Sequence, residues 1–192
     1  MTPEQLLDLY RRSGALLDGH FRLSSGLHSA GYLQCALVLQ HPAHAEALGR
    51  EIARATEELR PTVVLSPALG GVVIGHEVAR ALGVRALFAE RQDGVLTLRR
   101  GFVLADNDRV LVVEDVLTTG KSTRETIQVA VAAGGQVVGA ASIVDRSGGK
   151  AAFDVPFRAL VAVDLPTYEP DACPLCAQGL AVVKPGSRPI TV

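Results

Sequence analysis

The chain has 192 residues, of which 48% are hydrophobic, and its mean hydropathy of +0.26 indicates one domain with a sizeable buried core. The formal net charge is −1, so no basic field points to nucleic acid, and the longest apolar runs are strand-sized and broken by charge, which predicts no membrane span. Three cysteines, an odd number, argue against a disulfide framework and favour the reducing cytoplasm.

The first residues predict a helix, because Thr2 suits the N-cap position and Gln5 completes a capping box. This helix is expected to end near Arg12. Short strands are expected between residues 15 and 39. The stretch before Pro42 is therefore expected to form a small subdomain of its own, which we call the hood.

Beyond the hood, helices and strands alternate, which predicts an α/β fold with a mostly parallel sheet, flanking helices and right-handed crossovers. The expected helices cover residues 42–59, 72–82 and 124–133, and the expected strands cover 62–65, 84–88, 110–113, 137–144 and 159–163. The polar segment 90–101 reads as a hairpin or mobile loop. One domain is expected, with the hood at about 1–41, a core at about 42–164 and a surface-wrapping tail at about 165–192.

The central stretch, residues 110–123, combines a buried strand, a polar turn and a helix start. Four apolar residues precede Glu114 and Asp115, and the hydroxyl-rich turn 118–123 follows. Open α/β sheets bind ligands at this carboxyl end of a strand. Backbone N–H groups and hydroxyls at the start of a helix suit a phosphate, whereas the two carboxylates suit the vicinal hydroxyls of a ribose.

A nucleoside triphosphatase is the first alternative for this turn. Gly120, Lys121 and Ser122 match the end of a Walker A loop. That motif requires a glycine five positions before Gly120, where Asp115 stands. The turn is therefore not expected to be a Walker A loop.

Two further segments lie where the same sheet edge is expected. The loop 66–71 joins a strand to a helix, and its two glycines let backbone N–H groups approach an anion. A tight turn between strand and helix explains the two glycines equally well. Arg146 follows Asp145 at the end of another strand. It either pairs with Asp145 at the surface or forms a fork for a planar carboxylate.

The stretch 110–123 resembles the phosphoribosyl-pyrophosphate (PRPP) signature of the type I phosphoribosyltransferases. The hood motif 21–29, of the form Phe-x-Leu-x-Ser-Gly-x-x-Ser, and the pair Asp145-Arg146 are similar to those of orotate phosphoribosyltransferases. The tail, from the Cys-x-x-Cys at 173–176 to Arg188, resembles one branch of that family. The resemblance covers nearly the whole chain. It implies the type I phosphoribosyltransferase fold and the formation of orotidine 5′-monophosphate from orotate and PRPP in pyrimidine biosynthesis.

The resemblance also implies roles for individual residues, with Glu114 and Asp115 on the ribose hydroxyls and the turn 118–123 around the 5′-phosphate. The implied PRPP contacts are Ala68, Leu69, Gly70, Gly71, Arg91, Glu114, Asp115, Val116, Leu117, Thr118, Thr119, Gly120, Lys121 and Ser122. The implied orotate contacts are Ser25, Gly26, Thr118 and Arg146, and the implied catalytic residues are Arg91, Arg99 and Asp115. The family often has a cis peptide in the loop 68–71, which would face pyrophosphate. Mg²⁺ held mainly by PRPP and a homodimer with loops shared between sites are implied as well.

The chain departs from the better-known members of the family. Ser24 and Gly70 stand where those members have lysines, and the counterpart of their long mobile loop is shorter and uses arginines. Arg91 matches the loop arginine of the family. We expect Arg91, together with Arg99 or Arg100, to neutralise the leaving pyrophosphate. These arginines are expected to extend into the site of the neighbouring subunit.

Two alternatives of function stay open in the sequence. A purine or uracil phosphoribosyltransferase would keep the PRPP site, but a neutral base offers no carboxylate for Arg146. A non-catalytic regulator that senses PRPP and binds RNA or DNA is disfavoured by the net charge of −1 and the lack of an added domain.

The cysteines and histidines suggest no complete metal site. Cys173 and Cys176 form half of a zinc site at best, because no second pair of ligands lies nearby in the sequence. Two reduced thiols in a proline turn are the expected reading. His20, His28 and His76 are expected to be structural or surface residues rather than a catalytic base, and His28 is noted because it lies in the hood motif.

Overall fold

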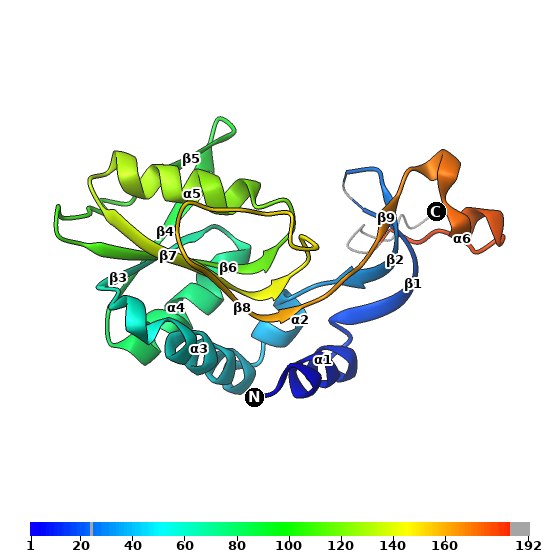
Figure 1. Ribbon diagram of the computed structural model, residues 1–192, viewed down its shortest axis with the longest axis horizontal. Coiled ribbons are helices and arrows are strands. Elements are labelled where there is room, and N and C mark those ends of the chain that lie inside the picture. Colours follow the sequence, from blue (N-terminus) through cyan, green and yellow to red (C-terminus); the bar gives the residue numbers. More distant parts are fainter. Residues whose placement is uncertain (24, 185–192) are drawn as a thin grey trace.

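Two β-sheets organise the chain, and the structure, a computed structural model, describes residues 1–23 and 25–184 (Figure 1). The larger sheet has the strand order β5-β4-β3-β6-β7-β8, and the smaller has the order β1-β2-β9. The strands are β1 (Leu16–Arg22), β2 (His28–Leu33), β3 (Val63–Pro67), β4 (Arg85–Gln92), β5 (Val95–Leu98), β6 (Arg109–Leu117), β7 (Gln136–Asp145), β8 (Phe157–Ala162) and β9 (Thr167–Tyr168). The α-helices are α1 (Pro3–Arg12), α2 (Ala36–Leu39), α3 (Pro42–Thr56), α4 (Gly70–Leu82), α5 (Lys121–Ala132) and α6 (Pro174–Ala177), with 3₁₀ turns at Glu57–Leu59 and Pro170–Ala172.

The larger sheet is mostly parallel, as the alternation of helices and strands predicts. Strands β4, β3, β6, β7 and β8 pair in parallel, and β5 returns antiparallel to β4 as a hairpin. The hairpin corresponds to the segment 90–101, for which a hairpin or a loop was expected. Helix α5 covers one face of the sheet, and α3 and α4 cover the other (Figure 1).

The apolar run of β6 is buried on both faces of the sheet, because successive side chains point to opposite sides of a strand. Val110 and Val112 join the cluster packed under α5, whereas Leu111 and Val113 join the cluster under α3 and α4. All four are fully buried. The central strand is therefore fixed by packing from both faces, and its last residues reach the sheet edge in a defined position.

Close helix packing fixes the loop that precedes α4. A Cβ atom added at Gly75 would lie 1.9 Å from the hydroxyl of Ser66, and one added at Gly49 would lie 2.7 Å from the Cβ atom of Glu77. Glycine therefore lets α4 contact both β3 and α3 directly. This contact places the start of α4, at Gly70, against the end of the central strand.

The N-terminal helix follows its prediction. The Thr2 hydroxyl accepts the Gln5 N–H at 3.3 Å, and the Gln5 side chain accepts the Thr2 N–H at 2.9 Å, so the capping box is present. Residues 36–39, however, form the short helix α2 rather than strand, so that part of the prediction is wrong. Periodicity cannot distinguish the two structures in so short an apolar run.

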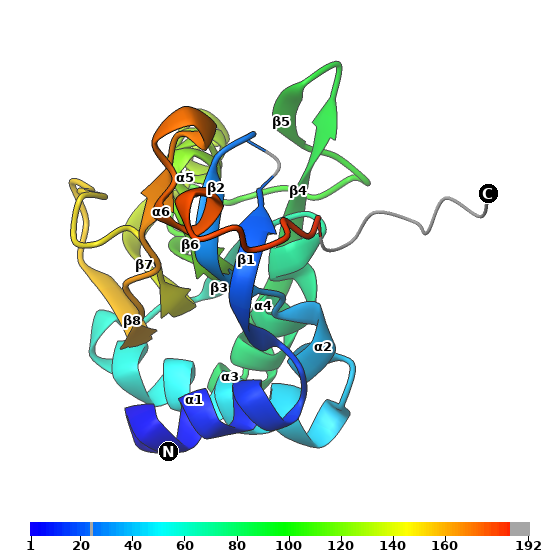
Figure 2. The same cartoon turned by 90° about the vertical axis from the view of Figure 1, so that its right-hand side faces the viewer.

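The tail completes the hood instead of only covering the surface. Strand β9 pairs antiparallel with β2, where Tyr168 lies opposite His28, and Val183 forms a bridge with Phe21 on β1. Figure 2 shows α6 and the tail beside β1 and β2, while α1 lies at the other end of the hood. No helix within residues 1–23 and 25–184 has both the length and the apolar character to cross a bilayer.

Candidate functional site

A cleft of about 780 Å³ opens between the larger sheet and the hood, at the carboxyl ends of β6 and β7. Its walls come from Leu23, Ser25 and Leu27 of the hood, the ends of β6 and β7, and residues 164–167. This volume lies within the range of ordinary small-molecule sites. The position agrees with the expectation that ligands bind at this edge of the sheet.

The charge of the cleft favours an anionic ligand. Its walls contain four basic side chains, from Arg22, Arg146, Lys150 and Lys184, and one carboxylate, from Asp164. A concave surface with an excess of one sign raises the local concentration of ligands of the opposite sign. The sequence interpretation singled out only Arg146 among these basic residues, because Arg22 occupies a variable position of the hood motif and no specific role was expected for Lys150 or Lys184.

The acidic pair lies near the carboxyl end of β6, and the strand continues past the expected residues 110–113 to Leu117. Both carboxylates are partly buried, and neither pairs with a basic side chain of the described residues. The Thr123 hydroxyl donates a hydrogen bond to Glu114. Burial raises the pKa of Glu114 to about 7, although the Thr123 bond opposes this and the Asp115 charge adds to it. Burial also raises the pKa of Asp115. Two carboxylates without a basic partner suit a ligand that brings hydroxyl groups.

The turn 118–123 offers donors to an anion. Thr118 and Thr119 are exposed, Gly120 adopts a left-handed conformation with φ of 73°, and α5 begins at Lys121. The Lys121 N–H donates to the Thr119 hydroxyl at 3.3 Å. The N–H groups of the first turn of α5 lie next to these hydroxyls in the chain, which is the arrangement that binds phosphate groups.

The loop 68–71 lies directly beside the acidic pair. Its Ala68–Leu69 peptide bond is cis, as the resemblance implied. A Cβ atom at Gly70 would lie 2.7 Å from a carboxylate oxygen of Asp115. A lysine at this position, as in better-known members of the family, would therefore require the Asp115 carboxylate to move.

Arg146 faces the cleft together with Thr118 and Ser25, three of the four residues expected to bind orotate. The surface pair with Asp145 is not formed, since Asp145 accepts the Ser147 N–H at 2.7 Å. The Nε atom of Arg146 is buried without a hydrogen-bond partner among the described residues, and burial lowers the pKa of its guanidinium. The fourth residue, Gly26, lies in the hood turn with φ of 91° and does not line the cleft.

The loop arginines do not reach the cleft. Arg91 forms an ion pair with Glu125 at 2.5 Å, whereas Arg99 and Arg100 pair with Glu90 at 3.5 and 2.9 Å. The β4–β5 hairpin that carries them projects from the sheet (Figures 1 and 2). Their expected role stays a prediction. Two residues used in the sequence interpretation, Ser24 and Arg188, lie outside the described residues.

The two tail cysteines are free thiols in a proline turn, as expected, but the fold places a second pair of possible metal ligands beside them. Cys173 and Cys176 meet His20 and His28, and the four donor atoms all lie within 4.8 Å of one another. The pairing of β9 with β2 brings these distant segments together. His20 and His28 are thus members of one cluster rather than isolated histidines.

Comparison with known proteins gives one consistent family. Residues 37–161 match the phosphoribosyl transferase domain model. An orotate phosphoribosyltransferase of Desulforamulus reducens is 52% identical over 191 residues, which covers 100% of both chains. One from Heliobacterium modesticaldum is 52% identical over 190 residues, covering 98% of this chain and 100% of the other.

Solved structures agree with the sequence relatives. The orotate phosphoribosyltransferase of Mycobacterium tuberculosis with inorganic phosphate is 28% identical, with a TM-score of 0.68 over 82% of this chain and 94% of that one. The Aeropyrum pernix enzyme is 27% identical, with a TM-score of 0.67 over 82% and 93%. The Mycobacterium tuberculosis enzyme in complex with PRPP is 27% identical, with a TM-score of 0.63 over 82% and 94%.

Proposed function

Since the chain belongs to the type I phosphoribosyltransferases, and within them to the orotate phosphoribosyltransferase family, we propose that its cleft transfers the phosphoribosyl group of PRPP to orotate. The products are orotidine 5′-monophosphate and pyrophosphate, in pyrimidine biosynthesis. The observation that carries the proposal is Arg146, a guanidinium that faces the cleft and has no carboxylate partner among the described residues. Orotate brings a planar carboxylate that suits this fork.

The two loops divide the work of holding PRPP. Glu114 and Asp115 accept hydrogen bonds from the ribose hydroxyls, and the turn 118–123 binds the 5′-phosphate. The loop 68–71 faces the pyrophosphate. The contact between Gly70 and Asp115 supports this division, because it places the pyrophosphate loop beside the ribose carboxylates. The relative from Mycobacterium tuberculosis binds PRPP within the same fold.

The reaction breaks the bond between the anomeric carbon and a pyrophosphate oxygen and forms a bond from that carbon to a ring nitrogen of orotate. Positive charge develops on the sugar and negative charge on the leaving group. The chain's contribution is to position both substrates, exclude water and stabilise these charges. Arg91 with Arg99 or Arg100 supplies positive charge to pyrophosphate. For this, the hairpin must give up its pairs with Glu125 and Glu90.

Magnesium fits the donors at this edge of the sheet. Glu114 and Asp115 are carboxylates without a basic partner among residues 1–23 and 25–184, and Mg²⁺ binds through one or two carboxylates together with substrate phosphates. When bound with PRPP, the ion neutralises charge on the pyrophosphate oxygens. The substrate holds most of its coordination in this proposal.

The assembly is a homodimer in which the β4–β5 hairpin of one subunit reaches the cleft of the other. The hairpin's projection from its own sheet supports this arrangement (Figure 2). We place the enzyme in the cytoplasm, in agreement with three free cysteines. Sedimentation of the purified chain measures the mass, and a monomer that turns over at full rate would contradict the shared site.

A panel of bases tests the reaction. The purified chain is assayed with PRPP, Mg²⁺ and orotate, uracil, adenine or hypoxanthine in turn. Orotate alone is expected to give rapid release of pyrophosphate, because uracil is the same ring without the carboxylate. Faster turnover of a purine or of uracil would overturn the choice of base. Tight PRPP binding without turnover of any base would favour the regulator instead.

A further inference from the structure

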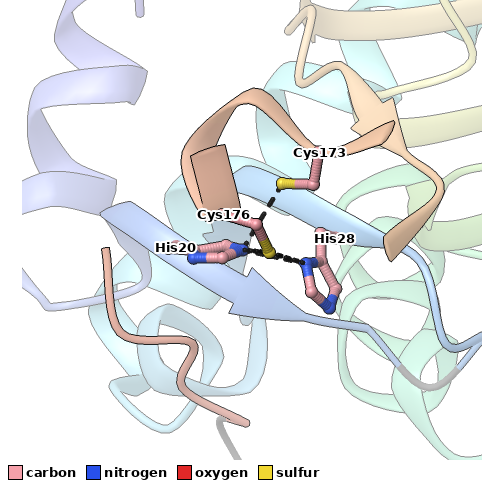
Figure 3. A group of neighbouring side chains, drawn as sticks. All are labelled: His20, His28, Cys173 and Cys176. Carbon is pink, nitrogen blue, oxygen red and sulfur yellow. Dashed lines mark hydrogen bonds between the residues drawn. The ribbon is translucent and has the colours of Figure 1, made fainter. Parts of the chain in front are cut away.

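Four side chains known as metal ligands converge in the hood, outside the cleft. They are His20 on β1, His28 at the start of β2, and Cys173 and Cys176 in the tail (Figure 3). We propose that these four residues bind one structural zinc ion, which fastens the tail to the hood.

The distances agree with a tetrahedral site. Zinc with bonds of about 2.3 Å to sulfur and about 2.0 Å to nitrogen separates its ligand atoms by roughly 3.3 to 3.8 Å. The Sγ atom of Cys173 lies 3.5 Å from Nε2 of His20. The Sγ atom of Cys176 lies 3.8 Å from the same nitrogen and 3.4 Å from Nδ1 of His28. The two nitrogens are 2.9 Å apart, so a bound ion would separate them slightly.

A second contact orients one of the ligands. The Nδ1 atom of His20 lies 2.8 Å from the carbonyl oxygen of Leu180, which can only accept a hydrogen bond. Nδ1 therefore carries the proton, and the lone pair of Nε2 points toward the two sulfurs and His28 (Figure 3). A backbone carbonyl that holds the outer nitrogen of a histidine is a regular feature of zinc sites.

The donor set selects zinc and a structural role. Two thiolates are soft donors and two imidazoles are borderline ones, and no carboxylate belongs to the cluster, so Mg²⁺ and Ca²⁺ do not suit it. Four protein ligands leave no open position for water or substrate, which is typical of structural zinc. His20, His28 and Cys173 are buried, so the ion would be shielded from competing ligands.

The site would hold one wall of the cleft in place. Strand β9 begins at Thr167, six residues before Cys173, and the cleft residues 164–167 lie immediately before it or at its start. On the other side, Arg22 lines the cleft two residues after His20. A zinc bridge between these segments would therefore tie the tail to β1 close to the residues of both that line the cleft.

Metal analysis tests the site directly. The untagged chain is purified from cells grown with added zinc. Inductively coupled plasma mass spectrometry is expected to find one zinc ion per chain. The double variant Cys173→Ser/Cys176→Ser is expected to lose it. Cys35→Ser is the matched control, because Cys35 is buried in the core outside the cluster. His76→Ala, an exposed histidine on α4, is the control for His20→Ala. Both controls are expected to keep the zinc.

Cobalt gives a reading that does not depend on the variants folding. Chelator-treated chain titrated with Co²⁺ is expected to show thiolate-to-metal absorption and the strong visible bands of a tetrahedral site, reaching a plateau at one ion per chain. Removal of zinc is expected to lower Tm by at least about 5 °C and to speed hydrogen exchange in β2 and β9 but not in β6. A chain without zinc and without these bands, or a disulfide between Cys173 and Cys176 in the native chain, would overturn the proposal.

Discussion

Arg146→Ala is expected to weaken orotate binding by about 3 kcal/mol, roughly 100-fold in Kd. The side chain is partly buried, its Nε atom has no partner in the described structure, and burial already lowers its pKa. The cost of removing its charge from water is thus present before orotate binds. Removing one partner of a buried charged pair costs about 2–5 kcal/mol, and partial exposure places Arg146 in the lower half of this range.

The assay is isothermal titration of orotate into the chain with PRPP analogue bound, with orotate KM as a second measure. Uracil lacks the carboxylate, so its weak affinity should change less than about threefold in the variant. Arg158→Ala is the matched control. Arg158 lies on β8, forms an ion pair with Glu58 at 3.0 Å and does not line the cleft. An orotate Kd for Arg146→Ala within threefold of the unaltered chain would refute the role of this arginine.

Three further outcomes follow from the geometry. Glu114 titrates near pH 7 when folded and at its ordinary 4.5 when unfolded, so its contribution to stability is complete below pH 4.5 and is lost as the pH rises through 7. Glu114→Gln should therefore reduce the change in the free energy of unfolding, measured in urea, between pH 5 and 8. An unchanged pH dependence in the variant would mean that another group causes it. Gly75→Ala adds a methyl group at the tight contact with β3 and should destabilise the fold by about 2 kcal/mol, whereas Val73→Ala, on an exposed position of the same helix, should be nearly neutral. Equal Tm values for these two variants would contradict the close packing of α4 on β3. Arg91→Ala should lower kcat by about 100-fold, and so should either Arg99→Ala or Arg100→Ala; unaltered turnover in all three would contradict these arginines as the source of positive charge.

Local patterns predicted the core well. The capping box at Thr2, the apolar strand that carries the acidic pair and the helix beyond the hydroxyl-rich turn each depend on residues within one turn or one strand. Their bounds differ from the prediction, because the strand continues to Leu117 and the helix already begins at Lys121. The packing of both sheet faces then follows, because an apolar run bounded by polar turns has few other arrangements. For the same reason, Arg146 could be placed at the correct edge from its position after a strand.

Long-range pairing could not be predicted in this way. The cysteine pair in the tail and the two histidines of the hood are separated by most of the chain, so no spacing rule connects them. His20 and His28 flank the turn between two strands, which is the signal that could have suggested a shared site. The ion pairs of the arginines on the β4–β5 hairpin could not be predicted either, because they depend on which carboxylates the fold places nearby.

The hood sheet has a consequence for synthesis on the ribosome. Its third strand, β9, comes after every strand of the larger sheet, yet it pairs with β2 near the beginning of the chain. A nascent chain can therefore complete the larger sheet while β1 and β2 still lack their partner. The wall that the tail contributes to the cleft can form only after these last residues have been synthesised.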